Sequence, residues 1–231
     1  MPATIQTYAP PSRLFRYRPI TDLNLTRELK AISEGYVFCP SYKEMNDPME
    51  GAHAESAMLQ KAKSYAVTVA QVTEAKGELG IASFSESNLS EPMWAHYANE
   101  FRGVCIGYNF KKLLNELPND DVFVRMSYNE KAPVLFNDQK SAGQRARMVL
   151  STKAVRWGAE REWRLIRPRR GEAEYNSINC VSGIYLGSRI SPEHRAAIKK
   201  VAHQLSVPLW AMEIDQYAIS FKRVLKAPKK S

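Results

Sequence analysis

The sequence predicts a single α+β domain. Strand-like and helix-like segments are mixed along the 231 residues, without the regular strand–helix–strand repeats of a parallel α/β sheet. No internal repeat or low-complexity linker divides the chain, and an apolar content of 44% is enough for a substantial core. We therefore expect one domain over residues 1–231, with an irregular lead at 1–12, a basic tail at 224–231, and a mixed central sheet or sheets flanked by helices.

The first third of the chain alternates between extended and helical patterns. Aromatic and aliphatic residues favour strands, whereas Gly35 is suited to end a helix and the Pro- and Asn-containing stretch "PSYKEMNDPMEG" to form a loop. In chain order we expect a strand at 13–18, a helix at 24–34, a strand at 36–39, a loop at 40–51, a helix at 53–75 and a strand at 80–86.

The helix at 90–103, "SEPMWAHYANEFRG", has the clearest boundaries. Ser90 can cap its first turn, Pro92 suits that turn, and Gly103 suits the exit. An apolar stripe at helical spacing is formed by Trp94, Tyr97, Ala98 and Phe101.

The rest of the chain is again mixed. Runs rich in β-branched and aromatic residues, bounded by Gly, Pro or Asn, predict strands. We expect strands at 103–109, 160–167, 178–187, 208–214 and 218–222, with helices at 136–152 and 191–205. The central strands are expected to include 13–18, 80–86, 103–109 and 160–167.

The strand at 160–167 raises a functional question. Side chains alternate across a strand, so Glu160, Glu162 and Arg164 are expected on one face and Trp163 and Leu165 on the other. One interpretation is that the charged face is simply solvated. The other is that the two glutamates are a pair of working carboxylates.

Two further strands carry polar pairs on one face. Arg16 and Arg18 can hold a phosphate, and Ser83 and Ser85 project together from the strand at 80–86. Arginine, then Ser-x-Ser, then Glu-x-Glu, in this order, resembles the layout of mono-ADP-ribosyltransferases. That resemblance implies a cleft in which NAD is a candidate substrate, and an enzyme that transfers or hydrolyses the ADP-ribose unit.

The resemblance also implies a role for each residue. Cleavage of the nicotinamide–ribose bond passes through an oxocarbenium-like transition state, which a carboxylate stabilises. Glu162 would be that carboxylate, Glu160 would address the acceptor, and Ser85 would orient Glu162. Arg16 or Arg18 would neutralise the phosphates, and the sequence leaves open which of the two does so.

A second resemblance covers most of the chain. The motifs "NDPME", "FS…MWAHYA…G" and "W..E.EWR" resemble bacterial domain-of-unknown-function family 2971. The resemblance brings no established activity but implies signature positions, namely Asn46, Asp47, Glu50, Ser85, Trp94, His96, Tyr97, Trp157, Glu160, Glu162 and Arg164.

Several of these residues are candidates for binding a nucleotide or another phosphate-bearing ligand. "NDPME" is either a purely structural turn or a loop that closes over a ligand, with Asp47 or Glu50 on a ribose or base. His96 is either a general base or a packing residue, and Trp94 and Tyr97 either wall a cleft or pack in the core. The full set of candidate binding residues is Arg16, Arg18, Asn46, Asp47, Trp94, His96, Tyr97 and Arg164.

The charge distribution supports an alternative function. Residues 1–150 hold 17 Lys+Arg and 17 Asp+Glu, whereas residues 151–231 hold 16 and 7, so the net charge of +9 lies in the last third. Such a surplus attracts a polyanion, which makes a nucleic-acid-binding or nuclease-like defence or toxin protein the alternative. A non-catalytic domain is the third possibility.

Other classes are disfavoured by what the sequence lacks. It has no Gly-rich phosphate loop, and its four histidines and three cysteines lack metal-ligand spacing, so we expect no metal. No apolar run of membrane-spanning length and no secretory leader are evident, and the unpatterned cysteines indicate a reducing compartment, so we expect a cytoplasmic protein without membrane contact. The oligomeric state is left open.

Overall fold

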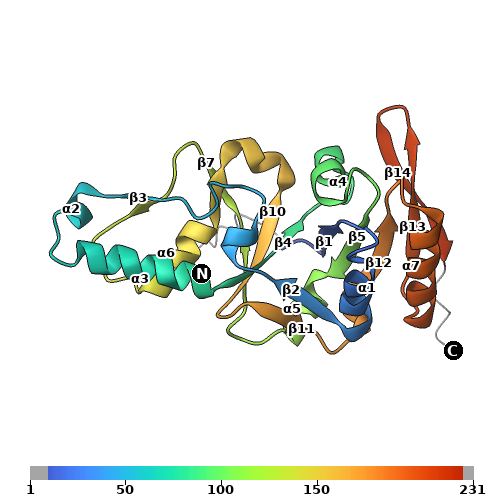
Figure 1. The fold of residues 1–231 in the computed structure, drawn as a ribbon, viewed down its shortest axis with the longest axis horizontal. Coiled ribbons are helices and arrows are strands. Elements are labelled where there is room, and N and C mark those ends of the chain that lie inside the picture. Colours follow the sequence, from blue (N-terminus) through green and yellow to red (C-terminus); the bar gives the residue numbers. More distant parts are fainter. Residues whose placement is uncertain (1–9, 226–231) are drawn as a thin grey trace, which may run out of the picture. The chain divides into compact units, whose positions relative to one another are not determined.

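The α+β class is confirmed by the structure, a computed structural model that describes residues 10–225 (Figure 1). The chain forms two compact units, each built from discontinuous segments. Unit 1 comprises Met1–Thr21, Glu86–Glu116 and Ser177–Ser231, as far as these are described, and unit 2 comprises Asp22–Ser85 and Leu117–Asn176. That the chain is a single domain stays a prediction.

Unit 1 is built on five sheet strands in the order β14-β13-β12-β5-β1. The strands are β1 (Arg13–Arg18), β5 (Val104–Asn109), β12 (Val181–Leu186), β13 (Leu209–Asp215) and β14 (Ala218–Leu225). Its helical segments are α4 (Glu91–Tyr97), α5 (Phe110–Glu116), η3 (Ile178–Cys180) and α7 (Pro192–Gln204).

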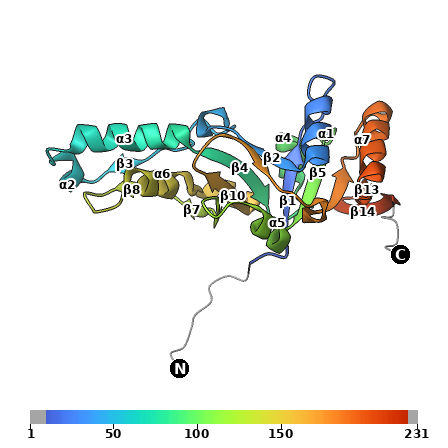
Figure 2. The same ribbon diagram turned by 90° about the horizontal axis from the view of Figure 1, so that it is seen from below.

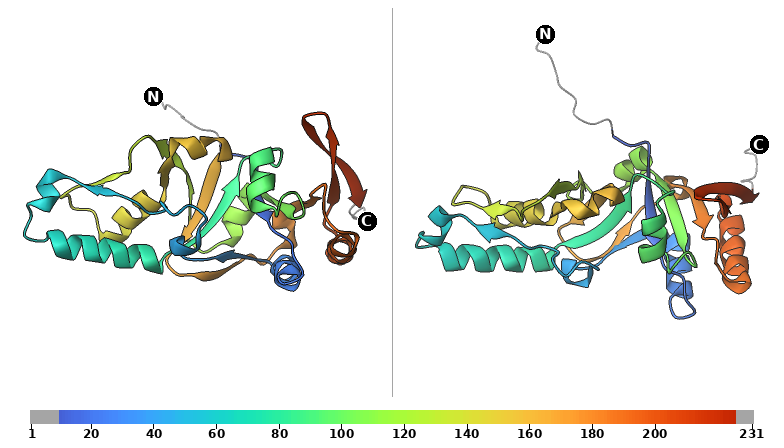
Figure 3. Two further views of the ribbon diagram at one scale, coloured as in Figure 1. Left: turned by 45° about the horizontal axis from the view of Figure 1, so that its top comes forward. Right: turned by 90° about the horizontal axis from the view of Figure 1, so that it is seen from above.

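Strand pairing in unit 1 is antiparallel except at one step. β12 and β13 run parallel, and α7 makes the crossover between them, as parallel strands require. Figure 3 shows α7 next to the hairpin of β13 and β14, and the helix contacts β14. The core gathers aromatic side chains from β1, α4, β12 and the last hairpin, including Phe15, Tyr17, Trp94 and Tyr185.

Unit 2 contains the three antiparallel strands β4 (Gly80–Ser85), β10 (Glu162–Arg167) and β6 (Val122–Arg125), with β10 in the middle. Three short two-stranded pairs accompany them: β2 (Tyr36–Cys39) with β11 (Gly171–Glu174), β3 (Ala54–Glu55) with β8 (Val134–Leu135), and β7 (Ser127–Asn129) with β9 (Thr152–Ala154). The helical segments are α1 (Leu25–Glu34), η1 (Tyr42–Glu44), α2 (Ala57–Gln60), α3 (Tyr65–Glu78), α6 (Ala142–Leu150) and η2 (Val155–Glu160).

The helices α3 and α6 pack against each other in unit 2 (Figure 2). Their apolar sides meet in a small core that includes Leu59, Val72, Leu135 and Val149. A second cluster, with Ile81 and Ile166 at its centre, joins the strands β4 and β10 to α6. Because β10 is flanked by a strand on each side, its side chains are well placed for burial.

Several predicted boundaries are confirmed because local chemistry sets them. α1 ends at Gly35, which has φ 75° and whose added Cβ would lie 2.6 Å from the Tyr175 carbonyl oxygen. Ser90 caps α4 by accepting a hydrogen bond from the backbone N–H of Met93. The strands expected at 13–18, 36–39 and 80–86 and the helix at 191–205 are present within a residue or two.

Three predicted helices were wrong in extent. The helix expected at 53–75 is replaced by β3, α2 and α3, because residues 54–55 pair with β8 and Ser56 starts a new helix by accepting from Leu59 N. The helix expected at 136–152 begins only at Ala142, where Ser141 and Gln144 form a capping box.

The helix expected at 90–103 ends at Tyr97. Asn99, Glu100 and Phe101 all have positive φ, and the Asn99 side-chain amide donates to the Ile20 carbonyl, so the chain turns before Gly103. This tertiary hydrogen bond has no local sequence signal.

Two predicted strands begin later than expected. Residues 178–180 are a short 3-10 helix, so the strand expected at 178–187 starts at Val181. Glu160 lies at the end of η2 and Arg161 has φ 45°, so the strand expected at 160–167 starts at Glu162. Glu160 and Glu162 therefore do not lie on the same strand, although the alternation argument assumed that they do. Of the basic tail expected at 224–231, residues 226–231 lie outside the described part.

Candidate functional site

The charged face of β10 is buried, so the interpretation of a solvated strand face, one of the two left open by the sequence, was wrong. Arg164 is 0% exposed, Glu162 3% and Glu160 7%. Buried ions are retained only where partners compensate for lost hydration. Five side chains of unit 2 supply this compensation and are called the buried charged network: Glu50, Lys153, Glu160, Glu162 and Arg164.

Arg164 is the centre of the network. Its Nε donates to Glu162 Oε1 at 2.7 Å, and its two Nη atoms hold both carboxylate oxygens of Glu50 at 2.5 and 2.8 Å. Nη1 also donates to the Leu150 carbonyl at 2.8 Å. A planar guanidinium with five donors is the side chain best suited to this bidentate geometry.

Lys153, from β9, completes the network. Its Nζ lies 2.6 Å from Glu160 Oε2 and 3.3 Å from Glu162 Oε2, and 4.6 Å from the ring centroid of Trp157. The two glutamates thus converge on one ammonium although only Glu162 is on a strand. The Trp157 ring lies within the range at which a cation is attracted to an aromatic face.

Two hydroxyl groups fix the backbone around the glutamates. Ser85 Oγ donates to the Glu160 carbonyl at 2.8 Å, and Tyr128 Oη accepts from the Glu162 N–H at 2.8 Å. In the β4–β10 register Ser85 lies opposite Glu162. The role assigned to Ser85, orienting the Glu162 carboxylate, stays a prediction.

The ionisation states follow from these contacts. Burial alone would raise the pKa of Glu162, but the charges of Arg164 and Lys153 outweigh it and lower that pKa to about 2. Burial opposes the charge of Lys153, yet Glu162 and Glu160 raise its pKa. Burial raises the pKa of Tyr128, which keeps its hydroxyl neutral. By formal charge, the network holds three acidic and two basic side chains, a sum of −1.

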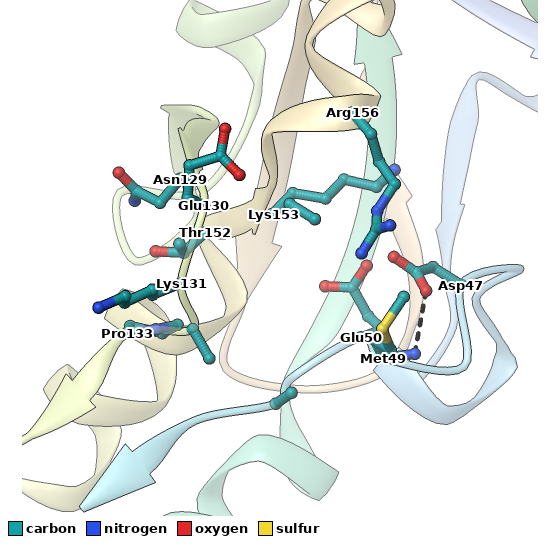
Figure 4. Close-up of a pocket in the computed structure, with 13 residues that line it drawn as sticks. Asp47, Met49, Glu50, Asn129, Glu130, Lys131, Pro133, Thr152, Lys153 and Arg156 are labelled. Carbon is teal, nitrogen blue, oxygen red and sulfur yellow. Dashed lines mark hydrogen bonds between the residues drawn. The ribbon is translucent and has the colours of Figure 1, made fainter.

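An open pocket of about 160 Å³ adjoins the network (Figure 4). Glu50 and Lys153 belong to both. The other polar and charged residues that line the pocket are Asp47, Asn129, Glu130, Lys131, Thr152 and Arg156. This volume suits a sugar or a phosphate group, or both, but not a whole dinucleotide.

The "NDPME" motif supplies one wall of the pocket. Asp47 Oδ1 accepts from Met49 N–H at 3.0 Å, and the Glu50 N–H donates to the Asp47 carbonyl at 3.0 Å. The motif is thus a structured turn, as one of the two interpretations required. Asp47 is nevertheless on the pocket, whereas Asn46 is exposed and does not line it.

Several charged groups that line the pocket have no protein partner in the described part of the chain, among them one oxygen of Asp47 and the guanidinium of Arg156. Across residues 10–225, no hydrogen bond or ion pair engages the second carboxylate oxygen of Asp47 or the guanidinium of Arg156. Figure 4 shows Arg156 reaching into the pocket toward the carboxylates of Asp47 and Glu50. A ligand with a hydroxyl or amine at one end and an anionic group at the other would satisfy both.

The remaining predicted binding residues belong to unit 1. Trp94 is 0% exposed, donates from Nε1 to the Asn88 carbonyl and packs on Tyr17 and Phe101, so its core interpretation is confirmed. His96 is exposed and Tyr97 half-buried. Arg16 is buried and Arg18 half-buried on β1. Whether any of them shares a cleft with Glu162 stays a prediction.

Sequence reasoning missed Lys153 and Arg156. They lie in "TKAVRW", a stretch without strand or helix periodicity that folds into β9 and η2. A basic residue seven positions before Glu160 is no signal by itself. The parallel pairing of β9 with β7 brings the Lys153 ammonium within contact distance of both glutamates.

The surplus of basic residues in the last third is partly buried. Lys153, Arg164 and Arg167 are all inside unit 2, and Arg167 lies 3.4 Å from Asp121. Their charges are matched by carboxylates and add little to a surface that would attract a polyanion. Within residues 10–225, no group of three or more His, Cys, Asp or Glu could hold a metal ion, and no helix is long and apolar enough to cross a membrane.

The fold and site define an α+β protein with a fully paired, buried charged network beside a small polar pocket. Residues 93–165 match the family described as "Protein of unknown function (DUF2971)", which confirms the expected resemblance over this segment. The matched segment contains Trp94, Lys153, Glu160, Glu162 and Arg164, and lies downstream of "NDPME". Comparison with curated proteins and with solved structures gives no match.

Proposed function

We propose that unit 2 binds a nucleotide of the ADP-ribose or NAD type in the pocket between the "NDPME" turn and η2. The observation that carries the proposal is that the second carboxylate oxygen of Asp47 and the guanidinium of Arg156 both lie on the pocket, close to each other, without a protein partner among residues 10–225. A carboxylate accepts hydrogen bonds from ribose hydroxyls, and a guanidinium binds phosphate in a bidentate manner. The pocket volume of about 160 Å³ matches the ribose and its phosphate, with the remainder of the ligand outside.

The buried charged network has a supporting role in this proposal. Glu50 is the one carboxylate that belongs to both network and pocket, and its bidentate contact with Arg164 fixes its position. A wall held by rigid, fully paired groups loses little side-chain entropy on binding. Glu162 itself is 3% exposed and both of its oxygens are engaged by Lys153 and Arg164. It therefore affects the ligand through these side chains rather than by direct contact.

Binding can be tested with ADP-ribose in equilibrium titrations. Asp47→Asn and Arg156→Gln each remove one charge-assisted hydrogen bond to the ligand, so each is expected to weaken binding about tenfold to a hundredfold. Asparagine keeps the Oδ1 acceptor that Met49 N–H uses, and the Arg156 guanidinium has no partner among residues 10–225, so thermal stability should change little. Lys199→Gln, on the exposed face of α7 in unit 1, is the matched control and should bind like the wild type. Unchanged affinity in both pocket variants would reject this site.

A second candidate function is cleavage of NAD, by transfer or hydrolysis of the ADP-ribose unit. It is favoured by the formal charge of −1 on the network, because a negative wall stabilises an oxocarbenium-like transition state. The sequence assigned this role to Glu162.

Release of nicotinamide from NAD tests this candidate. Under it, Glu162→Gln removes a negative charge from the wall and should slow release on the order of a hundredfold, about 3 kcal/mol. Glu174→Gln, at an exposed position on β11, is the control. Equal release by the wild type and Glu162→Gln, with ADP-ribose still bound, would leave binding without cleavage.

A further inference from the structure

Lys76 contacts the end of the turn that carries Asp47 and Glu50. It comes from the last turn of α3 and is 5% exposed. Its Nζ donates to the Gly51 carbonyl at 2.8 Å and lies 5.4 Å from the ring centroid of Tyr42. This hydrogen bond links the backbone of Gly51, the residue immediately after Glu50, to α3.

His53 shares this arrangement. Its Nδ1 is 3.2 Å from Lys76 Nζ and 3.3 Å from the Gly51 carbonyl oxygen, and its Nε2 is 3.7 Å from Glu55 Oε1. With a proton on Nε2 only, Nδ1 accepts from the ammonium while Nε2–H faces the Glu55 carboxylate. Lys76, Gly51 and His53 then form a closed set of compatible donors and acceptors.

A second proton on His53 would break this set. An imidazolium has no acceptor, so Nδ1–H would face the ammonium of Lys76 at 3.2 Å and compete with it for the Gly51 carbonyl. In the described part of the chain, the charged groups recorded at the ring are Lys76 from α3 and Glu55 from β3. The strand β8, which pairs with β3, contributes Val134 and Leu135, and neither ionises.

We propose that Lys76 is a positioning residue for the pocket wall and that protonation of His53 loosens its hold. When His53 is protonated, repulsion at 3.2 Å opposes the Lys76–Gly51 hydrogen bond and the "NDPME" turn becomes less ordered. Burial lowers the pKa of Lys76, an ammonium with no carboxylate partner among residues 10–225. Any effect of His53 protonation on ligand binding rests on the proposed function. The change in order of the turn does not depend on that function.

Hydrogen exchange of the turn tests the inference without any ligand. The amides of Met49, Glu50 and Ala52 are all bonded within the turn. Comparing the wild type with His53→Gln at the same pH cancels the intrinsic exchange rates. We expect equal exchange at pH 8 and several-fold faster exchange in the wild type at pH 5.5.

Two further variants separate positioning from general destabilisation. Lys76→Met should raise exchange at both pH values and abolish the difference that His53→Gln makes, whereas His203→Gln, an exposed histidine on α7, should behave like the wild type. The same ratio of wild-type to His53→Gln exchange at both pH values would overturn the proposal. If the exchange results hold while ADP-ribose fails to bind, the positioning device stands and the proposed function fails.

Discussion

Arg164→Met is expected to lower the free energy of unfolding by about 3–5 kcal/mol, the usual effect of removing one partner of a buried ion pair. Methionine approximates the length of the arginine stem, so the loss is mainly electrostatic. Glu50 would lose both of its guanidinium contacts and Glu162 its shortest one. Glu50 would then lack its cationic partner in the network, and Glu162 would keep only Lys153, which it shares with Glu160.

Denaturant unfolding followed by circular dichroism would measure this loss. Arg156→Met removes an arginine from the same unit, at an exposed position with no partner in the described part of the chain, and is expected to stay within about 0.5 kcal/mol of the wild type. A similar stability of the Arg164→Met protein and the wild type would contradict the burial and pairing described for β10.

Acid is expected to remove the contribution of Glu162. Its pKa falls from 4.5 to about 2 on folding, so the unfolded chain binds the proton more readily than the folded one. The stabilisation is therefore fully present above about pH 4.5 and is lost progressively as pH falls toward 2. A shift of this size corresponds to about 3 kcal/mol.

The difference between variants isolates this term from other carboxylates. Wild type and Glu174→Gln, an exposed control on β11, should lose stability with the same slope between pH 4.5 and 2. Glu162→Gln should start lower at pH 7 and fall less steeply over that interval, which unfolding at a series of pH values would reveal. Parallel profiles for all three proteins would show that Glu162 is not a depressed carboxylate.

How far the sequence predicts this molecule depends on whether the determining interactions are local. Gly35 ends α1 and Ser90 starts α4 through contacts with neighbouring residues, and both were predicted. The end of α4 depends on the bond from Asn99 to Ile20, and β3 exists because it pairs with β8. Such partners lie far along the chain and leave no periodic pattern.

The candidate site divides in the same way. Glu160, Glu162, Arg164 and the "NDPME" motif were recognised as unusual residues. Their arrangement was not, because alternation placed Glu160 on a strand that starts two residues later. The identification of Lys153 required the β7–β9 pairing, since only the fold brings that ammonium to the glutamates.

The central claim is that a nucleotide occupies the pocket between Asp47 and Arg156, and mapping of backbone amide shifts on titration with ADP-ribose tests it most directly. The account predicts saturable shifts concentrated in residues 47–52, 129–133 and 152–156, which contain the pocket lining, and their loss in Arg156→Gln. Saturable shifts that leave these three segments unaffected, or no shifts at all at millimolar ligand, would contradict it.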